Sequence, residues 1–278
     1  MVILGIEMVI DGRKIASDIL ENLKKQGAPK VFLAAFLVGN DPNSESFLKQ
    51  KEKFAKELGV DFRLYKFPEE ITQDELRKEI LKIAEYKTCG GAIVQLPLPA
   101  HISQQYVLNA IPREKDTDVL GERALGAFYA GRNPVLPPAV GVVEEILKVL
   151  NVELKIKSVA VIGRGVLVGK PVAVWLMDRA AELSVFTSKT GDTKDKLKTA
   201  DIIVSGVGKA SLFGAEDVKN EAIVIDFGYD KKDDKFCGDF DAANVPDSVN
   251  YTPTPGGTGP ILVAKLLENF FKLNGLQK

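Results

Sequence analysis

Histidine and cysteine are scarce in this chain of 278 residues, which contains one His and two Cys. A metal site built from several histidines is therefore excluded, and a Ser-His-Asp triad is possible only with His101 as its base. His101 follows a proline-rich turn, where we expect a surface position. Cys89 and Cys237 form no disulfide framework and have no metal-ligand spacing, which fits a reducing compartment. Proton transfer must then fall mainly to Lys, Asp, Glu or Tyr.

Long apolar runs and an excess of either charge are also lacking. The net charge is −1, which gives no sign of a nucleic-acid or membrane-surface partner, so we expect a small-molecule substrate. No stretch approaches the length of a membrane span. The apolar start, residues 1–10, includes Glu7 and has neither a basic region nor a small-residue cleavage site. We therefore expect a cytoplasmic protein.

Short apolar runs alternate with amphipathic stretches in the first half, which predicts a βαβ rhythm and a mostly parallel sheet. On the helix after the first strand, Phe47, Phe54 and Leu58 predict the recurring apolar face. The weakly periodic segment 111–138 predicts a long loop. The predicted strands are 31–38, 61–67 and 92–95, and the predicted helices are 44–58, 72–86 and 103–110.

A second βαβ series begins at Ser158, after a predicted helix at 140–150. Its strands are expected at 159–162, 183–186, 202–205 and 223–226, with helices between them, and a last helix at 259–273. The fold class is therefore α/β, with two α/β domains, the second Rossmann-like, and a cleft between them. We expect a first domain at 1–138, completed by the helix 259–278, and a second domain at 139–258.

A glycine-rich turn, Gly163–Pro171, joins the buried strand 158–162 to an apolar helix. Glycines at such a turn let the backbone approach a pyrophosphate, and the helix N-terminus that follows favours negative charge. The spacing G-x-G-x-x-x-G is one residue longer than the usual fingerprint. The setting between strand and helix indicates a dinucleotide site, whereas the glycines alone also fit an ordinary turn.

The end of the next strand indicates which dinucleotide binds. An NAD site usually places Asp or Glu there to accept a hydrogen bond from the ribose 2′-hydroxyl. Here the strand runs into Thr187, Ser188, Lys189 and Thr190. Hydroxyls and a cation suit a 2′-phosphate, so the sequence favours NADP. The alternative is that Lys189 is one more solvated lysine.

Several polar residues of the first half are placed to share one site. Phe47 and Lys51 are four residues apart and therefore lie on one face of a helix. Gln95 ends a predicted strand, where parallel sheets bind ligands. The segment 115–118 adds Asp118.

With these residues, the chain resembles the bifunctional methylenetetrahydrofolate dehydrogenase/methenyltetrahydrofolate cyclohydrolase family, and the resemblance covers nearly its whole length. The family's Q-L-P-L-P motif stands at 95–99 and its K-D-x-D motif at 115–118. Its G-R-x-x-x-V-G-x-P motif stands at 163–171 and its P-G-G-x-G-P motif at 255–260. The resemblance implies that 5,10-methylenetetrahydrofolate is oxidised to the methenyl form with NADP. It also implies that the methenyl form is hydrolysed to 10-formyltetrahydrofolate by a chain that forms a homodimer.

The resemblance also implies residue roles. Lys51 matches the active-site lysine, Gln95 the amide that hydrogen-bonds to it, and Asp118 the carboxylate that holds the pterin ring. For Lys51 to transfer protons at neutral pH, burial or neighbouring groups must lower its pKa. The substrate contacts implied are Phe47, Pro97, Pro255, Gly256 and Gly257. The cofactor contacts implied are Gly163, Arg164, Gly165, Gly169, Lys170, Pro171, Ser188 and Lys189.

The chain departs from the family pattern at four places. Phe47 stands where the family commonly has Tyr, which keeps the ring but loses a hydroxyl. Val119 follows K-D-x-D in place of Gly, and Gly165 replaces a serine. Residues 136–139 replace P-C-T. The alternatives are a dehydrogenase with weak or absent cyclohydrolase activity, a shikimate-dehydrogenase-like oxidoreductase, and a folate- or nucleotide-binding module without catalysis.

Overall fold

The parallel sheet of the first half has a fully buried central strand, as its sequence requires. A computed structural model describes residues 9–191, 193–232 and 234–275, so most of the apolar start lies outside the described residues. The sheet has the order β2-β1-β3, and β1 pairs in parallel with both neighbours. Every residue of β1, sequence FLAAFLV, is buried because both faces of the strand are covered.

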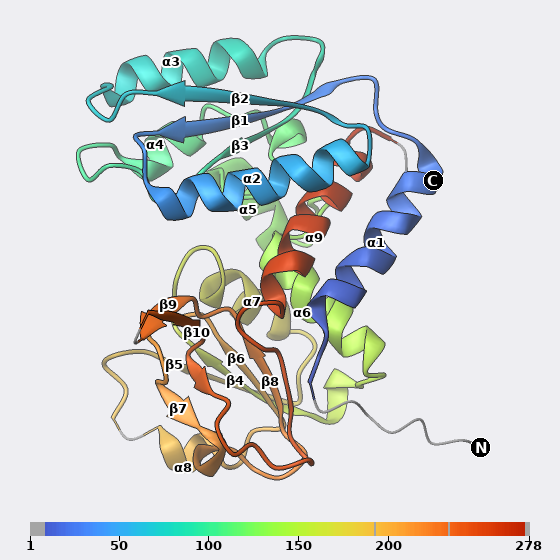
Figure 1. Cartoon of the computed structure of the whole chain (residues 1–278), viewed down its shortest axis with the longest axis vertical. Helices are drawn as coiled ribbons and strands as arrows, with labels where there is room; N and C mark the ends of the chain where they lie inside the picture. The colour runs from blue at the N-terminus through green and yellow to red at the C-terminus, as the bar shows by residue number, and fades with distance from the viewer. Residues whose placement is uncertain (1–8, 192, 233, 276–278) are drawn as a thin grey trace. The chain divides into compact units, whose positions relative to one another are not determined.

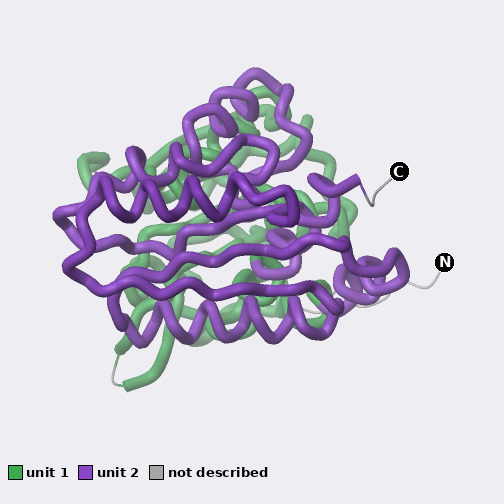
Figure 2. Tube along the Cα trace, turned by 90° about the horizontal axis from the view of Figure 1, so that it is seen from above, with its two compact units in different colours: residues 1–16, 139–262 green, residues 17–138, 263–278 purple. Residues whose placement is uncertain are grey.

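The chain divides into two compact units, coloured in Figure 2. Unit 1 comprises residues 1–16 and 139–262, and unit 2 comprises residues 17–138 and 263–278. Two helices, α1 (Gly12–Gln26) and α9 (Thr258–Leu273), each have several residues in both units, and α6 (Pro138–Val149) has its first residue in unit 2 and the rest in unit 1. The other elements of unit 2 are β1 Phe32–Val38, α2 Pro42–Glu57, β2 Asp61–Phe67, α3 Gln73–Ala84, β3 Cys89–Val94, α4 Gln104–Leu108, a 3-10 turn at Arg113–Lys115 and α5 Glu122–Tyr129.

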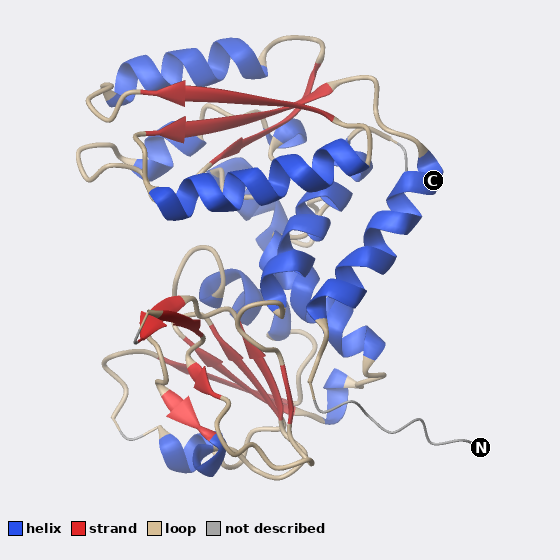
Figure 3. Cartoon of the chain, in the orientation of Figure 1, coloured by secondary structure: helices blue, strands red, loops and turns tan. Residues whose placement is uncertain are grey.

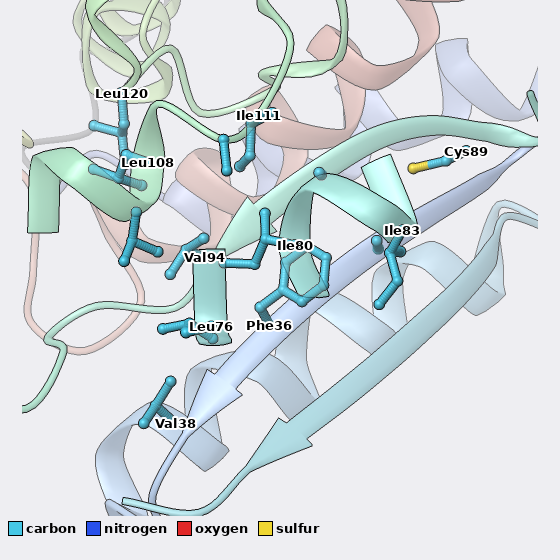
Figure 4. Close-up of a cluster of buried hydrophobic side chains, with 14 of the residues drawn as sticks. Phe36, Val38, Leu76, Ile80, Ile83, Cys89, Val94, Leu108, Ile111 and Leu120 are labelled. Atoms are coloured by element: carbon cyan, nitrogen blue, oxygen red, sulfur yellow. The ribbon is translucent and has the colours of Figure 1, made fainter. Parts of the chain in front are cut away.

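Helices α2 and α3 lie on opposite faces of the sheet of unit 2 (Figure 3). Asp41 caps α2 by accepting a hydrogen bond from the Ser44 amide, and Pro42 begins the helix. Thr72 and Glu75 form a capping box at the start of α3. On one sheet face, Leu76 and Ile80 of α3 join the apolar side chains of β1 and β3 in the core drawn in Figure 4.

Unit 1 is built on a five-stranded sheet of order β12-β8-β6-β4-β5 (Figure 1), in which every neighbouring pair is parallel. The chain passes from β4 to β5 on one side and returns to β6 on the other, which creates a topological switch point beside β4. The elements are α6 Pro138–Val149, a 3-10 turn at Leu154–Ile156, β4 Ser158–Ile162, α7 Gly169–Leu176, β5 Glu182–Phe186, α8 Lys194–Leu197, β6 Ile202–Ser205, β7 Phe213–Gly214, a 3-10 turn at Ala215–Asp217, β8 Ile223–Asp226, β9 Asp230–Lys232, β10 Lys235–Cys237, β11 Phe240–Asp241 and β12 Asn250–Tyr251.

Three expectations from the sequence are wrong. The segment 111–138 contains the helix α5, which is too short to show a clear apolar period. No α-helix is described between β6 and β8, where the chain forms β7 and a 3-10 turn instead. The buried face of α2 is formed by Ser44, Leu48, Lys51 and Ala55. Of the three residues expected there, Leu58, just after the helix, is buried, whereas Phe47 and Phe54 are half-buried.

His101 is exposed, as expected, and its Nε2 atom lies 3.1 Å from the Ile71 carbonyl oxygen. It lies before α4, which begins at Gln104. Within the described residues, no helix is both long enough and apolar enough to cross a membrane.

Candidate active site

A buried lysine amine and a buried amide meet at the carboxyl edge of the sheet of unit 2. The Nζ atom of Lys51 donates a hydrogen bond to Oε1 of Gln95 at 3.1 Å. Both residues are 8% exposed, so their polar groups depend largely on protein partners. The amide of Gln95 is oriented in turn, because its Nε2 donates to the Leu96 carbonyl at 2.8 Å.

Sheet geometry places these two side chains. Gln95 directly follows β3, and its backbone N–H donates to the Phe36 carbonyl of β1 at 2.9 Å, which extends the parallel ladder by one residue. Lys51 lies on α2, the helix that follows β1, and faces inward with Leu48 and Ala55. The unit formed by β1 and α2 therefore places the amine at the edge of the sheet at which β3 ends.

Burial lowers the pKa of Lys51, because the charged ammonium loses its hydration, and the nearby carboxylate of Asp118 partly opposes this. Asp118 is half-buried, and burial raises its pKa, opposed by Lys51. The direction of this shift is the one that proton transfer near neutral pH requires of a lysine. The three residues expected to be catalytic thus lie in the same unit, and Lys51 interacts with each of the other two.

The segment that contains Asp118 is tightly held on both sides. Asp116 is 2% exposed, and its Oδ2 accepts hydrogen bonds from Leu120 N at 3.0 Å and Gly121 N at 2.8 Å. Burial raises the pKa of Asp116 to about 7. Lys115 donates to the Ala84 carbonyl at 2.6 Å. Asp116 therefore closes the turn that follows it.

Val119 follows Asp118 with a φ of 56°, in the left-handed region that β-branched residues strongly avoid. Glycine is usual at this position in the family that the sequence resembles. The valine side chain is fully buried and packs with Ala124 and Val135. The chain thus adopts a glycine-like backbone at a valine, and the contacts around it must hold that conformation.

Two further expected substrate residues are also in unit 2. Phe47 lies one turn before Lys51 on α2 and is half-buried. Pro97 is exposed, directly beyond Gln95 and Leu96. Their places along the chain agree with a site around Lys51.

In unit 1, the glycine-rich turn follows β4 at the carboxyl edge of the sheet. Gly163 has a φ of 102°, and a Cβ atom at Gly169 would lie 2.2 Å from the Gly163 carbonyl oxygen. Glycine is therefore needed at both positions. A Cβ atom at Gly165 would meet nothing within 4 Å, so the turn does not require glycine there. The cradle that results fits a pyrophosphate against the N-terminus of α7.

The other expected cofactor residues surround this turn. Arg164 and Lys170 are exposed, and Pro171 is buried in α7. Ser188 and Lys189 are exposed in the turn after β5, whose last residue pairs with Ile162 of β4. The turn is closed by hydrogen bonds between Thr187 and Thr190 and contains no carboxylate. A 2′-phosphate would therefore meet hydroxyls and cations there, as an NADP site requires.

The segment Pro255–Gly257, also expected to contact substrate, lies in unit 1. Gly256 has a φ of 104°, and a Cβ atom at Gly257 would lie 2.5 Å from the Pro253 carbonyl oxygen. A Cβ atom at Gly12 would in turn collide with the Gly257 carbonyl oxygen. These glycines permit a tightly folded loop before α9.

Sequence reasoning missed a buried carboxylate that holds the loop after β6. Asp239 is fully buried and accepts hydrogen bonds from Ser205 Oγ at 2.6 Å, Val207 N at 2.8 Å and Lys209 N at 2.7 Å. Gly206, which lies between Ser205 and Val207, contacts the glycine-rich turn, since a Cβ atom at Gly206 would lie 2.7 Å from Val168. No motif considered in the sequence indicated Asp239.

Metal ligands were not expected from the sequence. In the three described stretches of chain, no group of three or more His, Cys, Asp or Glu side chains is arranged to hold a metal ion.

Comparison with known proteins gives the same family for both halves of the chain. A family model for the tetrahydrofolate dehydrogenase/cyclohydrolase catalytic domain matches residues 10–118. A second model, for the NAD(P)-binding domain of tetrahydrofolate dehydrogenase/cyclohydrolase, matches residues 137–278. The bifunctional protein FolD of Listeria innocua is 37% identical over 273 residues, which covers 95% of this chain and 96% of that protein.

Solved structures agree with these matches. The bifunctional FolD methylenetetrahydrofolate dehydrogenase/cyclohydrolase of Campylobacter jejuni is 33% identical with a TM-score of 0.91, covering 96% of this chain and 98% of that chain. The Trypanosoma brucei enzyme, solved with NADP cofactor and an inhibitor, is 32% identical with a TM-score of 0.90, covering 96% and 97% of the two chains. Shikimate 5-dehydrogenase of Thermus thermophilus is 15% identical with a TM-score of 0.51 over 88% of this chain and 94% of its own, a likeness of fold alone.

Proposed function

Because the chain belongs to the tetrahydrofolate dehydrogenase/cyclohydrolase family, we propose that it oxidises 5,10-methylenetetrahydrofolate with NADP and hydrolyses the methenyl product to 10-formyltetrahydrofolate. The observation that carries the proposal is the buried Lys51 amine, hydrogen-bonded to Gln95 beside the carboxylate of Asp118. Unit 2 is then the folate-binding domain and unit 1 the cofactor domain.

Asp118 and Phe47 are proposed to hold the pterin. A carboxylate has two acceptor oxygens and can accept from a ring N–H and an exocyclic amine together. Phe47, on the same helix face as Lys51, offers an aromatic ring for stacking. Pro97 and the loop Pro255–Gly257 are assigned to the substrate from the family pattern alone.

The dehydrogenase step needs orientation more than acid–base chemistry. NADP, when bound, accepts the hydride from the methylene carbon and leaves a resonance-stabilised methenyl cation. Gly163 and Gly169 form the cradle for the pyrophosphate, with Arg164, Gly165, Lys170 and Pro171 around it. Ser188 and Lys189 supply the contacts that distinguish a 2′-phosphate from a hydroxyl.

The hydrolase step needs proton transfer, and Lys51 is the group proposed for it. Water attacks the methenyl carbon and loses one proton, which leaves a hydroxyl group on that carbon. N5 then gains a proton as its bond to the carbon breaks, and the hydroxyl loses its proton to solvent as the formyl C=O forms, so the step releases one proton overall. A neutral amine can accept the first proton and return it in the second part of the step. Gln95 accepts a hydrogen bond from the amine and thereby fixes its position. The ring hydroxyl that Phe47 lacks makes no contribution in this scheme.

A paired assay tests the proposal. We expect the chain to reduce NADP with 5,10-methylenetetrahydrofolate, faster than it reduces NAD, and to accelerate loss of the methenyl absorbance above the rate without enzyme. Oxidation of shikimate with no turnover of either folate would contradict the proposal. Binding of tetrahydrofolate without any turnover would identify a non-catalytic module instead.

We also propose that the chain forms a homodimer in the cytoplasm, as the resemblance to its family implies. The free edge of strand β5 and the exposed side chains of Met177 and Val185 in unit 1 are compatible with a partner surface. Sedimentation equilibrium measures the mass in solution, and the mass of a single chain would contradict a dimer.

A further inference from the structure

We propose that Asn269, on helix α9, is a positioning residue that fixes the backbone presenting Asp118 to the substrate. This inference rests on the proposed role of Asp118 in holding the pterin. Asn269 is 4% exposed and comes from a helix far along the chain from Asp118. Both residues belong to unit 2.

The side-chain amide of Asn269 uses both of its N–H groups on backbone carbonyls. Its Nδ2 atom donates to the Thr117 carbonyl at 2.9 Å and to the Leu136 carbonyl at 2.8 Å. The Thr117 carbonyl belongs to the peptide group that joins Thr117 to Asp118. The hydrogen bond therefore fixes the plane of the peptide from which the Asp118 side chain projects.

Other contacts hold the same segment beside strand β3. Asp116 bridges to Ala92 in parallel fashion, and Thr117 Oγ1 donates to the Ala92 carbonyl at 3.4 Å. A Cβ atom at Gly91 would lie 2.8 Å from Phe270 and 2.9 Å from Thr117, so α9 and this segment both pack closely against the strand. That strand leads directly to Gln95.

The segment needs such anchors because of Val119. With its φ of 56°, this β-branched residue disfavours the observed backbone, which would relax if the anchors were lost. Asp116 holds the far side through Leu120 N and Gly121 N. Asn269 holds the near side, at the peptide next to Asp118. Where glycine occupies the position after the motif, the same conformation has no such strain to resist.

Asn274 provides a matched control in the same unit. It directly follows α9 and donates from Nδ2 to the Gly90 carbonyl at 3.1 Å and to the Phe270 carbonyl at 2.7 Å. It is therefore a second asparagine with two backbone acceptors, one of them near the start of β3. Among the described residues, neither of these acceptors belongs to the segment 116–121.

The test compares Asn269→Leu with Asn274→Leu in the full chain. Equilibrium titration with tetrahydrofolate should show a dissociation constant raised roughly 10- to 100-fold for Asn269→Leu, and one close to the parent value for Asn274→Leu. Thermal unfolding should show that both variants fold, with comparable loss of stability. If Asn269→Leu does not fold, Asn269→Ser, which is smaller and retains one donor, takes its place.

The pH profile of methenyltetrahydrofolate hydrolysis gives a second readout. Lys51 faces Gln95, which is neutral, and Asp118, whose charge favours the ammonium. If Asp118 is displaced in Asn269→Leu, the midpoint of the acidic limb should move to lower pH, which a loss of stability alone would not cause. Parent-like binding and an unshifted midpoint in Asn269→Leu would overturn the inference. A parent chain that neither binds nor turns over folates would overturn the proposed function instead.

Discussion

The amine of Lys51 donates to the amide oxygen of Gln95 at 3.1 Å, although 44 residues separate them in the sequence. Gln95 Oε1 can accept this bond from either protonation state of the lysine, because both states have N–H donors. The amine is thus held in one place while its pKa is lowered by burial. A group arranged in this way can exchange a proton without moving.

Replacing Lys51 with alanine should reduce methenyltetrahydrofolate hydrolysis by about 10²- to 10⁴-fold, the usual contribution of a positioned acid–base group. Binding of NADP should be unchanged, because the residues proposed to bind the cofactor lie in the other unit. Stopped-flow absorbance and a binding titration measure the two effects. Lys49→Ala, an exposed lysine on the same helix, is the control. Unchanged hydrolysis in Lys51→Ala would remove Lys51 from the mechanism.

Asp116 should make the protein less stable as the pH rises. Its pKa is about 7 in the folded chain against an ordinary value of 3.8, so between these values the folded state binds more protons than the unfolded state. The free energy of unfolding therefore falls as pH rises through this window, by an amount of the order of 4 kcal/mol. Asp226, with a pKa also raised to about 7, should contribute in the same direction.

Asp116→Asn should remove the share of this slope that belongs to Asp116. The asparagine oxygen can accept both N–H groups that now bond to Oδ2, so the fold should persist. Urea unfolding at several pH values between about 4 and about 8 measures the slope. Asp178→Asn, at an exposed position, is the control and should leave the slope as it is. An equal slope in Asp116→Asn and the parent would contradict the assignment.

Val119→Gly should be more stable than Val119→Ala by about 1 kcal/mol, because only alanine retains a Cβ atom in the left-handed region. Both variants lose the two methyl groups of a valine that is buried with Ala124 and Val135, so their difference depends on the Cβ atom and the backbone alone. Where φ is negative, the usual order is the reverse. Urea denaturation of the two variants at one pH provides the comparison. Greater stability of the alanine variant would mean that φ at this position is not positive.

Lys189→Ala should raise the KM for NADP about tenfold and leave the KM for NAD unchanged, because only NADP has the 2′-phosphate that a charge-assisted hydrogen bond would hold. Initial rates with 5,10-methylenetetrahydrofolate measure both constants. Lys198→Ala, another exposed lysine of unit 1, tests whether loss of any positive charge has the same effect. A parallel rise for both cofactors, or none, would exclude Lys189 as the residue that selects NADP.

The strands of four or more residues were predictable from the sequence, and all of them except β2 and β5 are largely buried, whereas the short strands β7 and β9 to β12 were not predicted. The ranges Asp61–Phe67, Ile202–Ser205 and Ile223–Asp226 match their predictions to the residue. Helix α5 was not predictable, because two turns that contain a glycine show little periodicity. The segment between β6 and β8 forms no described α-helix, and the predicted helix fails there because Gly206, Gly208 and Gly214 interrupt it.

The candidate site was predictable where a residue's position follows from the order of the elements. Gln95 directly follows a strand and Lys51 lies one turn from Phe47, and both statements need only the chain order. The buried inward face of α2 was not predictable, because it includes a charged residue and leaves two phenylalanines half-exposed. Asn269 and Asp239 were missed for a different reason, since all but one of the partners named for them are backbone groups, which have no sequence signature.

Unit 2 is synthesised in two separate parts, because residues 263–278 belong to it together with residues 17–138. While residues 139–262 are being synthesised, the segment around Asp118 lacks its Asn269 anchor and Val119 has less to hold it in its left-handed state. Unit 1 has its full set of residues earlier, once residue 262 has emerged. The nascent protein should accordingly be able to bind dinucleotide before it can bind folate.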